Sequence, residues 1–171
     1  MADEKILIVD DEEGLRKVLR IMLSKEGYEI SVAGSGAEAL ELVDREPFHA
    51  VISDIKMPGM SGIELLKQIR ARDPRLPVVM MTAYAALDTA IEAVNQGAFH
   101  YFVKQTSNEE IKLVLRRALE VSRLRSENRY LKHELKKTLE PRKIIGQSPR
   151  IHQVFDTIRK VAKADSTVLL C

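Results

Sequence analysis

The sequence predicts an α/β protein built on a parallel sheet, because short apolar runs alternate with amphipathic helical patterns through its first hundred residues. Five of these runs are short and bounded by turn-forming residues, as buried parallel strands are. We expect strands near residues 6–9, 28–33, 50–52, 78–81 and 101–103, and helices near residues 15–25, 37–43, 63–71 and 89–96. Five strands alternating with helices imply a sheet that is covered on both faces.

Serine residues mark three of the helix starts. Each is followed three residues later by a glutamate, which is the spacing of a capping box, where the two side chains satisfy each other's backbone N–H groups. The pairs are Ser35 with Glu38, Ser61 with Glu64, and Ser107 with Glu110.

The charge of the chain is unevenly spread. Residues 1–104 carry 12 Lys/Arg and 17 Asp/Glu, whereas residues 105–171 carry 15 and 8, which indicates two physical units with different roles. The basic residues are interleaved with glutamates and lack aromatic partners, so we expect no direct nucleic-acid binding by this chain. No apolar run has the length of a membrane helix. The single cysteine, Cys171, allows no internal disulfide, and we expect a cytoplasmic location.

Reactive side chains stand where the predicted strands end. The first strand ends in Asp10 and Asp11, the third in Asp54, the fourth in Thr82 and the fifth in Lys104. Because ligands of open parallel sheets bind outside the carboxyl ends of the strands, we expect these side chains to lie together. Clustered carboxylates need a hard cation such as Mg²⁺. Asp54 could then be a nucleophile for phosphorus, with Lys104 offsetting the negative charge that builds up.

Each of these residues also has an ordinary structural interpretation. Asp10 and Asp11 could favour the start of a helix, and Asp54 could form a turn before the Pro-Gly pair that follows it. Thr82 could be a plain strand residue and Lys104 a solvated cation. Their coincidence at one edge of the sheet favours a functional site.

A single helical pattern runs from about residue 108 to residue 139, far longer than an average helix. Its first turns can pack on the sheet, but beyond residue 120 its apolar residues narrow to one seam. This heptad seam has Val121, Asn128 and Leu135 at a positions and Leu124 and Leu131 at d positions. Asn at an a position favours a two-stranded parallel coil, so we expect a homodimer through this linker helix. A lone surface helix would leave the seam in water.

The rear of the chain reads as the opening of a second domain. Pro141 should end the long helix, and an amphipathic helix near residues 151–161 and a strand near residues 167–170 should follow. One helix and one strand cannot bury their own apolar faces. We therefore divide the chain into a domain over residues 1–120, a coiled-coil linker over 121–140 and an incomplete domain over 141–171.

Four motifs of the front half closely resemble the receiver domains of two-component response regulators. They are LIVDDE at residues 7–12, SDIKMPGMSG at 53–62, MTAY at 81–84 and YFVK at 101–104. The resemblance implies a flavodoxin-like sheet in the order 2-1-3-4-5 and a sensor histidine kinase as partner. It implies Asp54 as the phosphoacceptor and a Mg²⁺ site formed by Asp10, Asp11, Asp54 and the Lys56 backbone carbonyl. It also makes Thr82 and Tyr101 the pair whose movement reports phosphorylation, with Lys104 contacting the phosphoryl group, although Tyr101 could equally be plain packing at the sheet edge.

The rear resembles the start of the ATPase domain of sigma-54-dependent transcriptional activators, through IGQSP at residues 145–149 and DSTVLL at 165–170. The resemblance implies that the longer protein acts on sigma-54 RNA polymerase at promoter DNA. The sequence holds no G-x-x-x-x-G-K-[ST] phosphate loop. We therefore expect a fragment that accepts a phosphoryl group and is not itself an ATPase.

One position departs from the receiver pattern, in which a cis proline usually follows the last-strand lysine. Here Gln105 follows Lys104. A cis bond before a residue other than proline costs about 2.5–4 kcal/mol, so we expect a trans peptide and a Lys104 that aims less tightly at Asp54.

Other functions fit the residues less well. A haloacid-dehalogenase-like phosphatase would have a D-x-D nucleophile motif after the first strand, and a flavodoxin would have a phosphate loop there instead of acids. A pseudo-receiver that only dimerises would not need the intact acidic set.

Overall fold

The computed structural model describes residues 4–83, 87–139 and 148–161 of the chain. It divides into two compact units, residues 1–129 and 130–171, which are described separately below.

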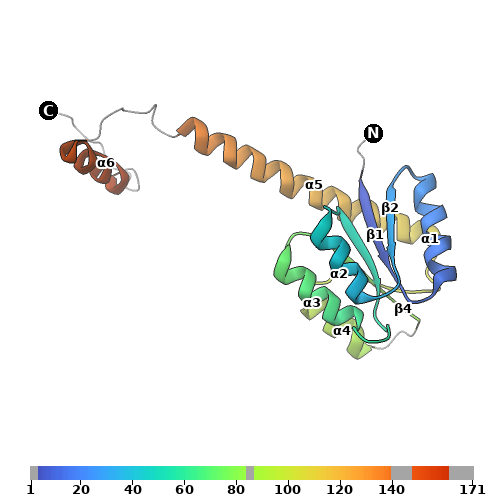
Figure 1. Cartoon of the computed structure of the whole chain (residues 1–171). Coiled ribbons are helices and arrows are strands. Elements are labelled where there is room, and N and C mark those ends of the chain that lie inside the picture. The colour runs from blue at the N-terminus through green and yellow to red at the C-terminus, as the bar shows by residue number, and fades with distance from the viewer. Residues whose placement is uncertain (1–3, 84–86, 140–147, 162–171) are drawn as a thin grey trace. The chain divides into compact units, whose positions relative to one another are not determined.

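The first unit is built on a five-stranded parallel sheet (Figure 1). Its strands are β1 (Lys5–Val9), β2 (Glu29–Ala33), β3 (Ala50–Asp54), β4 (Val78–Thr82) and β5 (His100–Val103). Their order in the sheet is β2-β1-β3-β4-β5, and every pair is parallel. The predicted α/β class and the order 2-1-3-4-5 are therefore confirmed.

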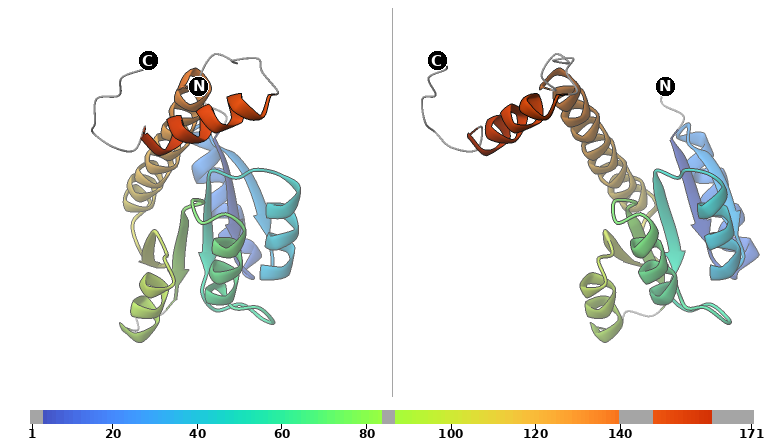
Figure 2. Two further views of the ribbon diagram at one scale, coloured as in Figure 1. Left: turned by 90° about the vertical axis from the view of Figure 1, so that its left-hand side faces the viewer. Right: turned by 60° about the vertical axis from the view of Figure 1, so that its left-hand side comes forward.

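Helices cover both faces of this sheet (Figures 1 and 2). They are α1 (Glu13–Lys25), α2 (Gly36–Arg45), α3 (Gly62–Arg72), α4 (Leu87–Asn95) and α5 (Asn108–Leu139). Residues of α1 and the first turns of α5 share one hydrophobic cluster with the sheet, and residues of α2, α3 and α4 share the other. Alternate residues of each strand feed the two clusters: Ile6 and Ile8 of β1 join the first, and Leu7 and Val9 join the second.

The predicted helix starts are correct: each serine accepts a hydrogen bond from the N–H of its glutamate, and among the described residues a complete capping box is present at Ser61. At Ser61 the hydroxyl accepts from the Glu64 N–H, and the Glu64 carboxylate accepts from the Ser61 N–H. At Ser35 the hydroxyl accepts from the Glu38 N–H, but the Glu38 carboxylate binds the N–H of Gly34 instead. The full box holds α3 directly after the loop that follows Asp54.

The long helix α5 runs over the predicted residues 108–139. In the rear of the chain, α6 (Pro149–Val161) confirms the predicted amphipathic helix, while the predicted strand at 167–170 and the break at Pro141 lie outside the described residues. Across the residues that the model describes, no helix combines the length and apolarity of a membrane span.

Candidate functional site

The carboxyl edge of the sheet brings the predicted residues together. Asp54 and Thr82 are the last residues of β3 and β4, while Asp10 and Lys104 directly follow β1 and β5. Carboxylate oxygens of Asp10, Asp11 and Asp54 all lie within 4.8 Å of one another. The acidic cluster expected from the parallel-strand pattern is thus present.

Lys104 is the cation at the centre of this edge. Its Nζ lies 2.9 Å from Asp54 Oδ2, 3.0 Å from Asp10 Oδ2 and 2.7 Å from Glu12 Oε1. Burial by itself lowers the pKa of Lys104, but its bonds to Glu12, Asp54 and Asp10 outweigh burial and raise that pKa. Lys104 is therefore held as a fixed positive charge beside Asp54.

The Lys104–Gln105 peptide is trans, as expected, since the described residues contain no cis bond. The expectation that Lys104 would then aim less tightly at Asp54 is wrong. The Lys104 N–H donates to the Thr82 carbonyl at 2.6 Å, which ties the end of β5 to β4. From that fixed backbone the long side chain reaches the carboxylates without a cis bond, because their attraction selects the rotamer.

Asp54 is held from two sides and is only 5% exposed. Its Oδ1 accepts a hydrogen bond from the N–H of Ile55 at 2.7 Å, and its Oδ2 pairs with Lys104. The chain then returns close to Asp54: the N–H of Gly62 donates to the Ile55 carbonyl at 2.8 Å. A Cβ at Gly62 would stand 1.9 Å from the Asp54 carbonyl oxygen, so only glycine fits there.

The two acids after β1 differ in their surroundings. Asp10 is buried, its Oδ1 accepts from the Glu12 N–H at 2.8 Å, and its Oδ2 makes the ion pair with Lys104 without hydrogen-bond geometry. Burial raises the pKa of Asp10. Asp11 is exposed. A cation bound here would satisfy Asp10 Oδ2, and a set of hard carboxylate oxygens suits Mg²⁺.

Thr82 and Tyr101 project from the same face of neighbouring strands. Tyr101 pairs in register with Met80, and Thr82 follows two residues after Met80 on β4, so strand alternation puts all three side chains on one face. Thr82 is buried, whereas Tyr101 is half-buried and packs against the cluster shared by α2, α3 and α4. Lys56 is exposed in the loop after β3.

Two further residues of the site were not singled out from the sequence. Glu12 pairs with Lys104, and this hydrogen bond lowers the pKa of Glu12. The guanidinium of Arg16 donates to the backbone carbonyl of Asp10. A helix periodicity argument could have found Arg16, because it lies one turn after Glu12 at the start of α1.

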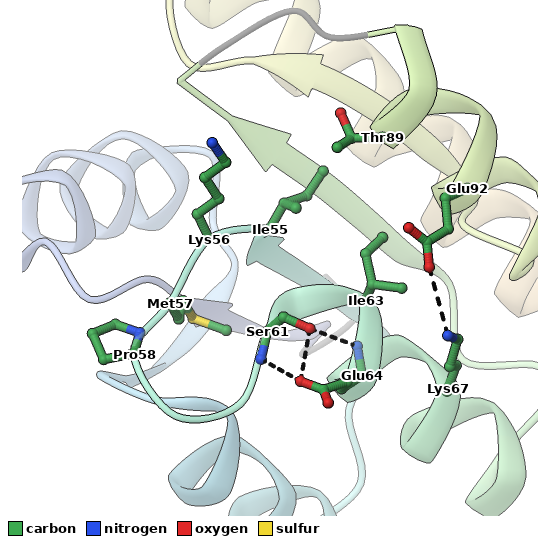
Figure 3. Close-up of a pocket in the computed structure, with 10 residues that line it drawn as sticks. All are labelled: Ile55, Lys56, Met57, Pro58, Ser61, Ile63, Glu64, Lys67, Thr89 and Glu92. Carbon is green, nitrogen blue, oxygen red and sulfur yellow. Dashed lines mark hydrogen bonds and ion pairs between the residues drawn. The ribbon is translucent and has the colours of Figure 1, made fainter.

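A groove of about 730 Å³ opens beside the site, between the loop after β3, α3 and α4 (Figure 3). Ile55 and Lys56, the residues immediately after Asp54, line one end of it, and Lys67 of α3 faces Glu92 of α4 across it at 3.6 Å. The acids of the carboxyl edge do not line it. The groove is thus a neighbour of the acidic site and not its cavity.

A 2-1-3-4-5 parallel sheet with clustered carboxylates, a hydroxyl and a lysine at its carboxyl edge defines a receiver domain. The chain belongs to the response regulator receiver domain family, whose model matches residues 6–116.

Similar proteins extend the likeness beyond the receiver. The chain is 37% identical over 170 residues to the regulatory protein AtoC of Escherichia coli, a match that covers 99% of this chain and 37% of AtoC. It is 35% identical over 165 residues to the DNA-binding transcriptional regulator NtrC of Escherichia coli, covering 96% of this chain and 34% of NtrC. The chain thus spans little more than a third of these relatives, and the match includes the residues after the receiver.

Among solved structures, the response regulator TrrA of Thermotoga maritima, in complex with Mg²⁺ and BeF, superposes with a TM-score of 0.63. It is 35% identical in sequence, and the match covers 68% of this chain and 99% of TrrA. The acidic cluster of Asp10, Asp11 and Asp54 is typical of a receiver Mg²⁺ site.

Proposed function

We propose that this chain is a phosphorylation switch in which Asp54 accepts a phosphoryl group from a sensor histidine kinase. The observation that carries the proposal is the pairing of the buried Asp54 carboxylate with the Lys104 ammonium at 2.9 Å, inside a cluster of carboxylates. A carboxylate fixed beside a cation is oriented as a nucleophile, and the cation can bind the oxygens of the incoming group.

In the proposed reaction an oxygen of Asp54 forms a bond to phosphorus as the bond from phosphorus to the donor nitrogen breaks. The leaving imidazole takes a proton from solvent, and the product is an acyl phosphate. Lys104 stays near the transferred group, because its other partners, Asp10 and Glu12, hold it at the edge. The Ile55 N–H keeps the Asp54 carboxylate oriented.

Asp10, Asp11, Asp54 and the Lys56 carbonyl would hold Mg²⁺. When bound, this cation offsets the negative charge that accumulates on the transferred group. Burial raises the pKa of Asp10, and the ion pair of Asp10 with Lys104 opposes that rise.

Thr82 and Tyr101 would carry the change away from the site. A hydroxyl at the end of β4 can donate to a phosphoryl oxygen, and its displacement frees space on the strand face that Tyr101 shares. Inward movement of the half-buried ring would then alter the surface formed by α4 and β5.

The rest of the chain would connect this switch to an output. We propose a receiver over residues 1–120, a dimerising linker over 121–140 and the start of an ATPase domain over 141–171. AtoC, named as a regulatory protein, and NtrC, named as a DNA-binding transcriptional regulator, match over nearly the whole chain, which supports this arrangement. In the longer protein the partners would be sigma-54 RNA polymerase and promoter DNA, and the homodimer would form through the linker helix.

The test is phosphorylation by a small phosphodonor with Mg²⁺, followed by intact mass. The chain should gain the mass of one phosphoryl group, lose it in hydroxylamine, and gain almost none after chelation of Mg²⁺. Asp54→Asn should abolish the gain, since an amide cannot form the acyl phosphate.

Asp44→Asn is the matched control, because Asp44 is an exposed aspartate on α2 that pairs with Arg72 and not with the site. It should gain the same mass at the same rate as the unmodified chain. An undiminished gain in Asp54→Asn would show that another residue is the acceptor.

A further inference from the structure

The ammonium of Lys104 has as many carboxylate neighbours as it has N–H groups. These neighbours are Asp10, Asp54 and Glu12, at 3.0, 2.9 and 2.7 Å. The contact with Glu12 is the shortest, and it has the geometry of a hydrogen bond. Because an ammonium has three protons to donate, a further oxygen can bind Lys104 fully only in place of one of these carboxylates. While Asp54 attacks phosphorus it is still a carboxylate beside Lys104, so a phosphoryl oxygen must displace another partner.

Glu12 is the partner of Lys104 that water can reach. Its side chain is 63% exposed, whereas those of Asp10 and Asp54 are 2% and 5% exposed. A released Glu12 carboxylate can be hydrated at little cost, but a buried carboxylate that loses its cation is left without a charge partner. The difference in exposure therefore favours Glu12 as the partner that exchanges.

The backbone of Glu12 is fixed, so only its side chain has to move. Its N–H donates to Asp10 Oδ1 at 2.8 Å, and its carbonyl accepts from the Arg16 N–H at 3.1 Å. Glu12 stands immediately before α1, where a side chain often caps the helix, but its carboxylate makes no such bond. The carboxylate pairs instead with Lys104, 92 residues further along the chain. Withdrawal of the Glu12 carboxylate from Lys104 therefore leaves the start of α1 as it is.

We propose that Glu12 is a positioning residue that holds Lys104 in the unphosphorylated chain and is displaced from it by the incoming phosphoryl group. The inference rests on the phosphorylation of Asp54 proposed above and adds a side chain that opposes it. A bond that is made before the reaction and lost during it stabilises only the starting state, so it raises the barrier. Glu12 thus lowers both the rate and the extent of phosphoryl transfer to Asp54.

The experiment measures the rate at which the whole chain gains phosphoryl mass from phosphoramidate with Mg²⁺. Glu12→Gln should react about three-fold faster than the unmodified chain, because a partly exposed ion pair is lost from the starting state. Glu13→Gln is the matched control, since Glu13 is the next residue, is similarly exposed and pairs with Lys17 outside the site. It removes the same charge from nearly the same place and should react at close to the unmodified rate.

Glu12→Asp separates the bond to Lys104 from the charge of the side chain. This variant keeps a carboxylate but shortens the side chain by one methylene group, so it should not reach Lys104 as Glu12 does at 2.7 Å. It should react as fast as Glu12→Gln. A rate equal to that of the unmodified chain would mean that residue 12 acts through its charge alone, and it would overturn the inference.

Calorimetric binding of beryllium fluoride with Mg²⁺ is a second readout, and it needs no phosphoryl transfer. The fluoride group takes the place of a phosphoryl group, so Glu12→Gln should bind it about three-fold more tightly, and Glu13→Gln should bind it as the unmodified chain does. This shift without mass gain in any variant would overturn the phosphorylation of Asp54 and leave the role of Glu12 standing. Mass gain at Asp54 with equal rates and equal affinities in the two glutamine variants would overturn the role of Glu12 alone. Neither mass gain nor binding would overturn both.

Discussion

The two halves of α5 differ in what covers them: the receiver buries the apolar stripe of the first half, whereas Leu124 and Leu131 in the second half are exposed. In the first half Leu115 is 1% exposed and packs in the cluster with α1 and the sheet. In the second half Leu124 is 52% exposed although its side chain is the same. Burial here follows from what lies opposite each face and not from the apolarity of the residue.

This difference in burial indicates which part of a continuous helix can serve a function beyond folding. A helix that leaves its own core usually becomes polar on all sides, because nothing covers its apolar residues. This helix instead keeps the narrow heptad seam, where Leu124 and Leu131 are exposed. We propose that its first half stabilises the receiver and that its second half serves association.

The sharpest way to test this division is Leu115→Ala in the first half. Loss of a fully buried leucine side chain should lower the free energy of unfolding by about 2–5 kcal/mol, because both transfer and cavity costs apply. Leu113→Ala is the matched control on the same half of α5, because Leu113 is exposed, and it should change stability by no more than about 0.5 kcal/mol. Urea unfolding measures both. Equal losses in the two variants would contradict the assignment of the core stripe.

The second test is Leu124→Ala in the other half of α5. Here we expect the substitution to reduce the affinity of the dimer and not the stability of the fold. The dimer should weaken roughly 100-fold, because two leucines are lost from one layer of the pair. The monomer unfolding free energy should hardly change. Sedimentation equilibrium measures the association and urea unfolding at low concentration measures the stability.

Tyr130→Ala is its control. Tyr130 is 64% exposed, more than Leu124, but lies off the heptad seam. Its removal should leave association as it was. If Tyr130→Ala weakens the dimer as much as Leu124→Ala does, then exposure and not heptad position determines the effect on dimer affinity. The assignment of the heptad seam would then be wrong.

The parallel sheet and the gathering of the site residues could be predicted from local patterns, whereas the strand order 2-1-3-4-5 came from the resemblance to receiver domains. Alternating strands and helices fix parallel connections, and parallel strands place their last residues at one edge. To place Asp54 and Thr82 at the site, it was enough to know where strands β3 and β4 end. The helical pattern of the sequence likewise predicted the extent of α5, which runs over residues 108–139.

The contacts of Lys104 could not be predicted in the same way. The prediction that Lys104 would contact Asp54 less closely considered only the peptide bond. It ignored the length of the lysine side chain and its electrostatic attraction to the surrounding carboxylates. Glu12 was missed for a related reason: whether a residue just before a helix turns toward the site or to solvent depends on side-chain rotamers, which no periodicity encodes. The Glu38 carboxylate, which binds Gly34 and not Ser35, is a similar case.

The smallest expected effect is at Asn128, the one polar residue within the heptad seam. An Asn at an a position selects two parallel strands in register but costs stability, because its amide is removed from water. Asn128→Val should therefore tighten the dimer by roughly ten-fold while loosening its selectivity, so that larger assemblies begin to form at high concentration. Ser126→Val, at the outer f position, should change neither property, and it controls for the lower helix propensity of valine. Sedimentation equilibrium over a wide concentration range measures affinity and assembly size together. A weaker dimer in Asn128→Val would mean that Asn128 faces water or makes an essential bond across the pair, and it would remove residue 128 from the a positions on which the seam depends.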